Sequence, residues 1–455
     1  MQKLNKPNSK QRGIALIIFA LILVLATTTF LVSQLDSNSI KIERDKQTVS
    51  ALAEAKAALL GFAAQSGTAS GAARPGDLPC PDTTNDGSSD ACVGNSIGRL
   101  PWKSLGISDL RDGDGERIWY AVSGNFKNNP RIYPLNSETV GTITLRDVSG
   151  TIINDGSTAS GLAAVVISPG VAIKRQDGVT QVRDTVANQN NAINYLDIAL
   201  GEDNSNFINS NTDGFIKGPI KDVNNNLILN DKLITIAQDE LMAVVEPRVI
   251  AAVSNALLDF YCGGVANANY VTKSCIAAGG NRFFPRPASF SDATCLGFSN
   301  ISAGCSSFAT ANHGRIPVNL TNPVTYYWNS TSILRGTPAN SIWYQRNAWR
   351  EQIHYAVAPV CVDGTLNCNG TGGMLTLNFA LTSPASRVVV TIAGKSQTGQ
   401  SRTLANKGME INYLEGENVS PLDNTYTRIA AGIFNDRSVN IPWWEYLQIN
   451  LAVLL

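Results

Sequence analysis

The sequence is poor in the side chains from which most catalytic centres are built. It has two histidines in 455 residues, His313 and His354, which leaves little scope for a Ser-His-Asp or Cys-His centre. Its one stretch like a phosphate loop, I-A-G-K-S at 392–396, has Val389 where that motif requires its first glycine. We therefore expect no enzymatic activity.

Neither sign of charge is in excess. The chain has 36 basic and 36 acidic residues and a pI near 6.7. Proteins that coat nucleic acid carry a clear basic excess, so we expect no nucleic-acid partner. Hydrophobic residues make up 44% of the chain, which is typical of folded domains rather than of disordered chains. The length allows two or three domains.

The cysteines include no C-x-x-C pair of the kind found in zinc sites and thioredoxin-like redox sites. An even number of cysteines behind a membrane-targeting segment indicates disulfides in an oxidising compartment. We favour bridges between nearest neighbours, although the sequence also allows other pairings and some free, buried thiols. The neighbouring pairs are Cys80 and Cys92, Cys262 and Cys275, Cys295 and Cys305, and Cys361 and Cys368.

Residues 14–35 form a long apolar segment without any charged residue. As a helix this segment is roughly 33 Å long, enough to cross a bilayer. The basic residues Lys3, Lys6, Lys10 and Arg12 precede it, so we expect a cytoplasmic N-terminus and an exported remainder. No A-x-A-like site closes the apolar run, which disfavours an ordinary secretion signal. A plain single-pass anchor is the alternative.

The helix is expected to continue beyond the apolar segment to about Gln65. The sequence there is rich in Ala, Lys, Glu and Leu, which favour helices. Val49, Leu52, Leu59 and Phe62 recur at helical spacing and predict an apolar stripe beside charged positions.

A short basic leader ending in glycine, an apolar half-helix and an amphipathic half-helix together resemble the class III signal of type IV pilins and type II secretion pseudopilins. Four motifs after the apolar segment strengthen the resemblance. They are L-L-G-F-A at 59–63, D-L-P-C-P-D at 77–82, G-R-L-P-W at 98–102 and E-R-I-W-Y-A-V-S at 116–123.

The resemblance implies that a prepilin peptidase cuts after Gly13 and methylates the new N-terminus at Ile14. It also implies anchoring in a bacterial inner membrane, with the C-terminal part periplasmic or displayed on a filament, and packing against other pilins or pseudopilins through the N-terminal helix. Most members carry Glu at the fifth mature position, where this chain has Ile18. That departure is similar to large minor subunits thought to sit at a filament tip.

The second half of the chain repeats seven short motifs of the first half in the same order. Three of these pairs are L-L-G-F (59–62) with L-L-D-F (257–260), G-R-L-P (98–101) with G-R-I-P (314–317), and E-R-I-W-Y-A-V-S (116–123) with E-Q-I-H-Y-A-V-A (351–358). The others are L-P-C-P (78–81) with F-P-R-P (284–287), A-A-V-V-I (163–167) with V-V-V-T-I (388–392), I-N-Y-L (193–196) with I-N-Y-L (411–414), and N-D-K (230–232) with N-D-R (435–437).

The repeat predicts an α+β fold with two tandem pilin-like modules, each a helix on a mainly antiparallel sheet. We expect a leader over 1–13, a transmembrane half-helix over 14–35, a first module over 36–235 and a second, degenerate module over 236–455. The Asn- and Gly-rich residues from 201 to 226 predict a long surface loop. The helix that follows is expected to pack on its own sheet rather than to span a membrane.

Two clusters of carboxylates offer oxygen ligands for calcium. Asp82, Asp86 and Asp90 flank a glycine-centred turn without the closing Glu of an EF-hand, and solvated Asp/Asn turns are the alternative. Asp112, Asp114 and Glu116 alternate with glycines, a pattern that is also typical of hairpin turns.

The final segment contains an aromatic cluster of Trp443, Trp444 and Tyr446. Exposed aromatic residues anchor binding surfaces, but a buried terminal strand is the more ordinary interpretation. His354 replaces Trp119 in the repeat and is expected at a half-buried strand position. The sequence thus predicts a minor pilin-like structural subunit, with a membrane-anchored pilin-derived adhesin or ligand-binding protein as the alternative.

Overall fold

The computed structural model has mixed helix and sheet, so the predicted α+β class is confirmed. Within 10–38 the side chains described are those of Leu23 and Val24. The residues that the structure describes are 10–65, 74–94, 96–207, 214–271, 274–276, 280–295, 305, 312–318, 320, 327–329, 331–335, 343–362, 368, 373–378, 385–419, 424–427 and 436–442.

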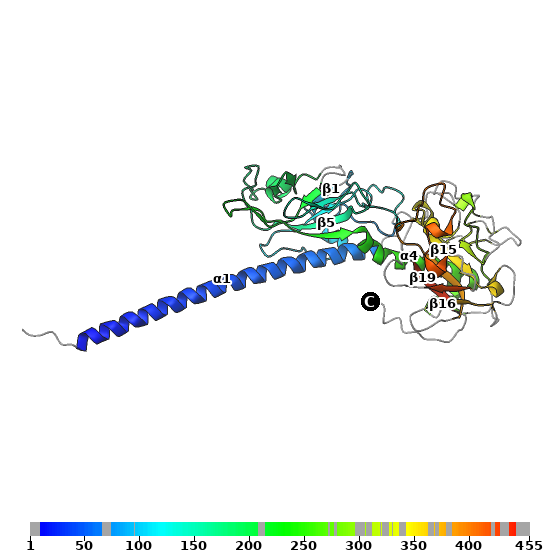
Figure 1. The fold of residues 1–455 in the computed structure, drawn as a ribbon, viewed down its shortest axis with the longest axis horizontal. Helices are drawn as coiled ribbons and strands as arrows, with labels where there is room; N and C mark the ends of the chain where they lie inside the picture. Colours follow the sequence, from blue (N-terminus) through cyan, green and yellow to red (C-terminus); the bar gives the residue numbers. More distant parts are fainter. Residues whose placement is uncertain are drawn as a thin grey trace, which may run out of the picture.

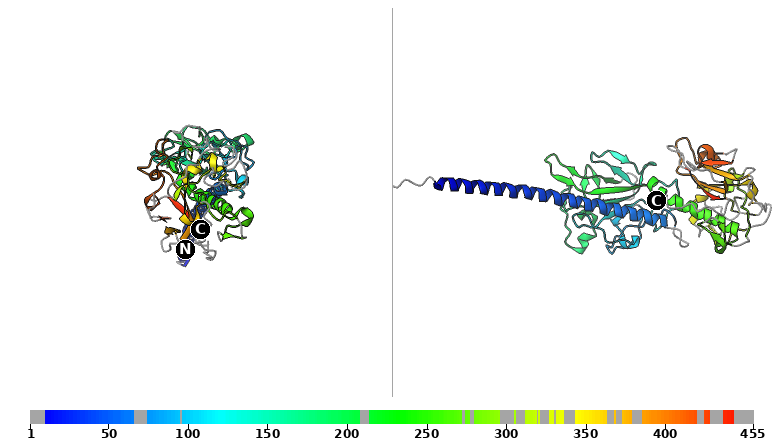
Figure 2. Two further views of the ribbon diagram at one scale, coloured as in Figure 1. Left: turned by 90° about the vertical axis from the view of Figure 1, so that its right-hand side faces the viewer. Right: turned by 90° about the horizontal axis from the view of Figure 1, so that it is seen from below.

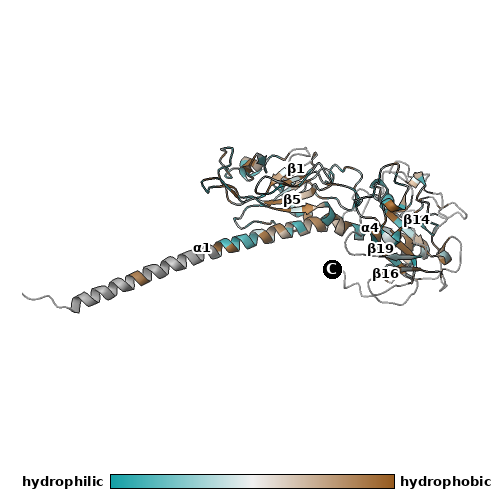
Figure 3. Cartoon of the chain, viewed as in Figure 1, coloured by the Kyte–Doolittle hydropathy of each residue, from teal (hydrophilic) through white to brown (hydrophobic). Residues whose placement is uncertain are grey.

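Helix α1 (Lys10–Gln65) projects from the globular part and then runs along it (Figure 1). Its buried stripe consists of small and medium residues, among them Ala51, Ala55 and Leu59, which allow the helix to lie close to a sheet. Apolar residues of α1 lie beside that sheet in Figure 3. Val49 was predicted in this stripe but is 63% exposed, because it lies outside the face set by the residues at 51, 55 and 59.

Two sheets, the first antiparallel and the second mainly antiparallel, form the bodies of the two modules. The first has the order β1-β2-β5-β11 and lies against α1. Its strands are β1 (Ser96–Arg99), β2 (Trp119–Val122), β5 (Leu162–Ser168) and β11 (Lys232–Ala237). The second has the order β14-β15-β17-β16-β18, with β19 also paired to β17. Its strands are β14 (His313–Arg315), β15 (Ile353–Val357), β16 (Leu375–Asn378), β17 (Ala385–Ile392), β18 (Thr425–Thr427) and β19 (Arg437–Pro442).

Helix α4 (Gln238–Cys262) begins directly after β11 and packs on both sheets. Val245, Val249, Val253 and Leu257 are fully buried in one core that includes residues of both sheets. Among the described residues, α4 is long and apolar enough to cross a membrane, but 61% of its most apolar window is buried inside the protein. It is therefore the core helix that was predicted.

We call residues 36–237 the first module and residues 238–442 the second module. The boundary predicted at 235/236 falls inside β11, which belongs to the first sheet. α1, the first module and the second module follow one another along the long axis (Figure 2).

The internal repeat extends to strand register. Gly98 pairs with Tyr120 in the first sheet, and Gly314 pairs with Tyr355 in the second. A Cβ on Gly98 would lie 2.7 Å from the carbonyl oxygen of Asp82, and one on Gly314 would lie 2.1 Å from a backbone carbonyl. Glycine at both positions therefore permits the same close approach of a neighbouring segment.

One predicted repeat pair is displaced by one residue. Trp119 pairs with Ile167, and His354, which replaces Trp119, pairs with Thr391. Ile167 therefore corresponds to Thr391, not to Ile392 as the motif match suggested. A shift of one residue matters because it moves every side chain to the other face of the strand.

The predicted surface loop at 201–226 is wrong in part, because several of its described residues are buried while those at 221–226 are mostly exposed. β8 (Gly214–Ile216) pairs in parallel with β3 (Thr144–Arg146), and Phe215 is fully buried. The buried Asn204 side chain donates to the carbonyl of Ile216 and accepts from its N–H. Asparagine is common in loops, but here its side chain pairs with the backbone N–H and carbonyl of a strand residue in the interior.

Short elements complete the fold. The helices are α2 (Trp102–Leu105), α3 (Val186–Gln189), α5 (Trp343–Arg346) and α6 (Trp349–Gln352), with 3₁₀ turns η1 (Ala192–Asn194), η2 (Val265–Asn267), η3 (Ala293–Cys295), η4 (Pro359–Cys361), η5 (Glu410–Asn412) and η6 (Gly416–Asn418). The remaining strands are β4 (Ile152–Asn154), β6 (Ile198–Ala199), β7 (Glu202–Asp203), β9 (Ile220–Lys221), β10 (Leu227–Leu229), β12 (Ala268–Asn269) and β13 (Ser274–Cys275).

All eight cysteines form disulfides, and each pairs with its nearest neighbour as predicted. Closing short loops of this kind stabilises a fold mainly by restricting the unfolded chain, by about 2–4 kcal/mol for an unstrained bridge. The bridges are Cys80–Cys92, Cys262–Cys275, Cys295–Cys305 and Cys361–Cys368.

Candidate functional site: the contact between the modules

The first acidic cluster is a hydrogen-bonded turn. Asp82 is buried, and its carboxylate accepts from the backbone N–H groups of Asn85 and Gly87, both at 2.6 Å. The carboxylates of Asp86 and Asp90 also accept N–H groups of the same turn. These carboxylate oxygens therefore accept hydrogen bonds from the backbone of the turn and stabilise its conformation.

The second acidic cluster joins a turn to the sheet and to α1. Buried Asp112 accepts from the N–H of Glu116 at 2.9 Å and from the hydroxyl of Ser168 at 2.8 Å. Asp114 instead pairs with Arg44 of α1 at 3.3 Å. Among the described residues, no three His, Cys, Asp or Glu side chains form a group that could hold a metal. The hydrogen bonds of both clusters agree with the turn interpretation, and calcium at either cluster stays a prediction.

Other predicted site residues lie outside the described side chains. Gly13, Ile14 and Ile18 fall within the backbone range of α1, but their side chains are not among those described. The aromatic cluster at 443–446 lies outside the described residues altogether. His354 is buried rather than half-buried, and stacks on Phe290 with ring centroids 4.6 Å apart.

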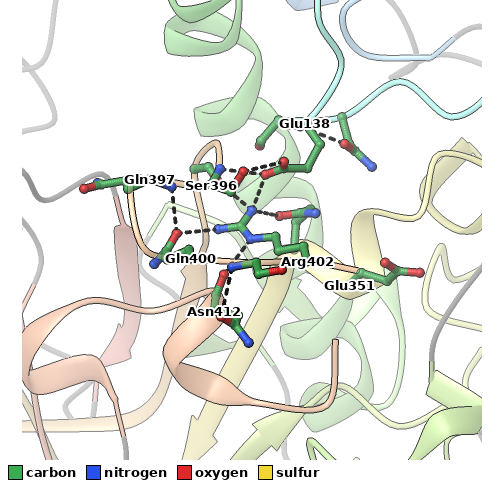
Figure 4. A network of polar contacts seen from close by, with 12 residues as sticks. Glu138, Glu351, Ser396, Gln397, Gln400, Arg402 and Asn412 are labelled. Atoms are coloured by element: carbon green, nitrogen blue, oxygen red, sulfur yellow. Dashed lines mark hydrogen bonds and ion pairs between the residues drawn. The ribbon is translucent and has the colours of Figure 1, made fainter. Parts of the chain in front are cut away.

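The most developed polar site in the described chain joins the two modules (Figure 4). Glu138 of the first module accepts from the N–H of Ser396 at 2.7 Å and from its hydroxyl at 2.9 Å. The same carboxylate forms an ion pair with Arg402. The Arg402 guanidinium is 5% exposed and also donates to the side chain of Gln352 and to the carbonyl of Gly394.

A second carboxylate contact lies beside this ion pair. Buried Glu246 of α4 accepts from the hydroxyl of Ser137 at 2.8 Å and pairs with Arg437 at 2.7 Å. Burial raises the pKa of Glu246 above its ordinary value, while Arg437 opposes the shift. Gln238 also donates to the carbonyl of Ser137 at 2.5 Å. Residue 137 is therefore held by α4, and residue 138 by the 396–402 segment that follows β17.

A cleft of about 490 Å³ opens at this contact. Its walls carry charges of both signs. Asp239 and Glu246 of α4 are acidic, and Lys395 and Arg437 are basic. That volume is in the range of small-molecule sites. Charged and polar side chains line it together with Met242, so it offers both hydrogen-bonding groups and apolar surface to a ligand or to water.

A third set of contacts extends the junction. The side-chain oxygen of Asn347 accepts from the N–H of Leu135 at 2.9 Å, and Asn136 donates to the carbonyl of Asn347 at 2.8 Å. The Arg346 guanidinium lies 3.9 Å from the centre of the Tyr133 ring. The loop from 133 to 138 thus contacts the second module along its whole length.

Around Tyr195 of the first module lies a polar network that sequence reasoning missed. Arg99 and Arg183 stack on the Tyr195 ring at 4.0 and 4.4 Å. Beneath them, Asp231 accepts from the N–H of Asp197 at 2.9 Å and from the amide of Asn204 at 2.8 Å. Burial raises the pKa of Asp197 to about 6 and that of Asp231 well above its ordinary value.

The second module repeats this network around Tyr413. Arg315 and Arg402 stack on the Tyr413 ring at 5.0 and 4.6 Å. Asp436 accepts from the N–H of Glu415 at 3.0 Å and from the amide of Asn418 at 3.1 Å. The I-N-Y-L motif was the sequence signal for both copies, because it contains the tyrosine of each network.

Comparisons with known proteins give no match to a family model, to a curated protein or to a solved structure. What the chain does must therefore be argued from its own residues.

Proposed function

We propose that this chain is a minor pilin-like structural subunit, anchored in a bacterial inner membrane before assembly and carried at the tip of a type IV pilus or type II secretion filament. The observation that supports the proposal most is α1. One helix covers both the apolar segment at 14–35 and the stripe that packs on the first sheet, so a membrane-embedded half and a globular half share a single rigid element.

The duplicated module supports the tip position. The second module has no membrane half-helix of its own at its start, because α4 follows β11 directly and is buried in the core. It therefore adds bulk on the side away from the N-terminal end of α1 (Figure 2). Such bulk is hard to repeat along a closely packed shaft, whereas a tip has room for it.

Changing Ile18 to Glu should leave assembly close to wild type, and labelling should find the protein at one end of each filament in few copies. The substitution restores the residue that the resembled family uses to neutralise a neighbouring amine, but a tip subunit has no subunit above it that requires this.

Immunogold microscopy with quantitative mass spectrometry of purified filaments measures both position and copy number. Labelling along the whole shaft, at a copy number near that of the major subunit, would rule out the tip position.

The cleft of about 490 Å³ favours one second candidate, a pilin-derived adhesin or ligand-binding protein outside a filament. Deletion of the gene separates the two functions. Loss of filaments or of secretion supports the structural subunit, and normal filaments with lost attachment support the adhesin.

A further inference from the structure

A pair of carboxyl groups, buried Asp436 and half-buried Glu415, lies behind the module contact. Glu415 lies between η5 and η6, and Asp436 immediately precedes β19. Each accepts the backbone N–H of the other, at 3.0 Å to Asp436 Oδ2 and at 3.1 Å to Glu415 Oε2. Asp436 is 2% exposed, and its Oδ1 has no hydrogen-bond partner among the described residues. Asp436 is buried and lies beside a second carboxyl group, and both conditions favour its protonated form.

A series of hydrogen bonds links this pair to the ion pair between the modules, and Figure 4 shows its part from Gln400 through Arg402 to Glu138. Gln400 donates to Glu415 Oε1 at 2.9 Å, and Arg402 donates to Gln400 Oε1 at 3.3 Å. Arg402 in turn holds Glu138 of the first module. A change in the position of Glu415 is therefore transmitted to Glu138 through two side chains.

A second series of contacts starts from Asp436, the other member of the pair. The residue after Asp436 is Arg437, which pairs with Glu246 of α4 at 2.7 Å. Glu246 accepts from the hydroxyl of Ser137 at 2.8 Å. Both series of contacts thus end on neighbouring residues, 137 and 138, of the first module.

We propose that the Glu415–Asp436 pair is a proton-operated latch on the contact between the modules. With Asp436 protonated, the pair holds the 410–418 loop against the start of β19 and keeps Arg402 and Arg437 on their carboxylate partners. When Asp436 loses that proton, its negative charge is buried beside the Glu415 carboxyl group, which is unfavourable. The loop then moves away from β19, and the second module is released from residues 137 and 138.

The direction of the pH dependence follows from the surroundings. Burial, and next the neighbouring Glu415, raise the pKa of Asp436 well above its ordinary value. A carboxyl group whose pKa is raised by folding stabilises the folded contact below its ordinary pKa, and this stabilisation is lost as pH rises through the raised pKa. The latch therefore holds in acid and opens as the medium becomes alkaline. The charged groups around it are Asp239 and Glu246 of α4, Lys395 and Arg402 of the 394–402 segment, Glu417 of η6 and Arg437 of β19.

The first module supplies an internal control. Asp197 and Asp231 form the equivalent pair, and Gln181 donates to Asp197 as Gln400 donates to Glu415. The positive charges of Arg175 and Arg183 face that pair. None of the described hydrogen bonds of Asp197 or Asp231 reaches the second module, so its titration should leave the module contact unchanged.

The latch is tested by pulsed electron spin resonance on the full chain in detergent, with spin labels at Val148→Cys and Leu404→Cys. Both positions are exposed, and all native cysteines are paired, so the labels react only there. At about pH 5.5 we expect one narrow distance distribution, and at about pH 8.5 a broader or longer one. Asp436→Asn, which keeps an acceptor and cannot ionise, should give the narrow distribution at both pH values.

The matched variant Asp231→Asn should retain the wild-type response. Glu415→Gln provides a second test if circular dichroism shows that Asp436→Asn is misfolded, and it should also abolish the response. An unchanged distance distribution in the wild type between the two pH values would overturn the proposal. So would a folded Asp436→Asn or Glu415→Gln variant that responds as the wild type does.

Discussion

Replacing Arg315 by methionine lowers the free energy of unfolding by about 2–4 kcal/mol, and replacing Arg99 by methionine does so by a similar amount. Arg315 is 1% exposed and donates to the carbonyls of Glu351 and Lys407. Arg99 is 4% exposed and donates to the carbonyls of Arg117 and Gln189. Methionine fills part of each volume but leaves these buried carbonyls unpaired and removes the stacking on the tyrosine of each network.

Chemical denaturation followed by circular dichroism measures both effects. Arg111→Met is the matched control, because the Arg111 side chain is 45% exposed in its ion pair with Asp109 and should change stability by about 0.5 kcal/mol or less. If replacing one of the two buried arginines changes the stability as little as Arg111→Met does, the two networks do not stabilise their modules equally. The modules would then share their structure but not the energetic role of this arginine.

Replacing Leu257 by alanine destabilises both modules together, by about 2–5 kcal/mol. Leu257 lies near the C-terminal end of α4 and is fully buried. The core that contains it includes Ala55 of α1 and Tyr120 of the first sheet as well as Val388 of the second. Because this core is continuous, packing lost in the second module should also lower the stability of the first module.

Hydrogen exchange distinguishes joint from separate unfolding. In Leu257→Ala, the protection of β5 and of β17 should fall by the same free energy, while Arg248→Ala, at an exposed position of α4, should change neither by more than about 0.5 kcal/mol. Retained protection in β5 with loss in β17 would show that the modules fold independently and that α4 does not couple them.

The sequence predicted those features of the fold that depend on residues close together in the chain. The four disulfides join cysteines that are close in the chain, and the motif pairs G-R-L-P and G-R-I-P correspond to β1 and β14 in the same register. The one-residue error at Ile167 arose because a run of β-branched residues matches equally well at neighbouring offsets. Only the pairing with Trp119 and His354 settles which offset is right.

The module contact could not be predicted from the sequence, because its partners are far apart. Glu138 and Arg402 are separated by 264 residues, and neither belongs to a recognisable motif. For Asp82 and Asp112 the sequence left calcium ligands and turn residues open as alternatives, for a related reason. Carboxylates spaced like metal ligands are also spaced to accept several backbone N–H groups of one turn, and only the folded chain shows which of these they do.

The mature N-terminus tests the central claim most directly. Intact-mass and N-terminal peptide analysis should be done on the protein from cells with and without an active prepilin peptidase. In cells with the peptidase, the account predicts a chain that begins at Ile14 with a methylated amine, and in cells without it a chain that retains residues 1–13. A mature chain that begins beyond Leu35, or one that retains its leader in both strains, would contradict the proposal that this protein is a pilin-like subunit.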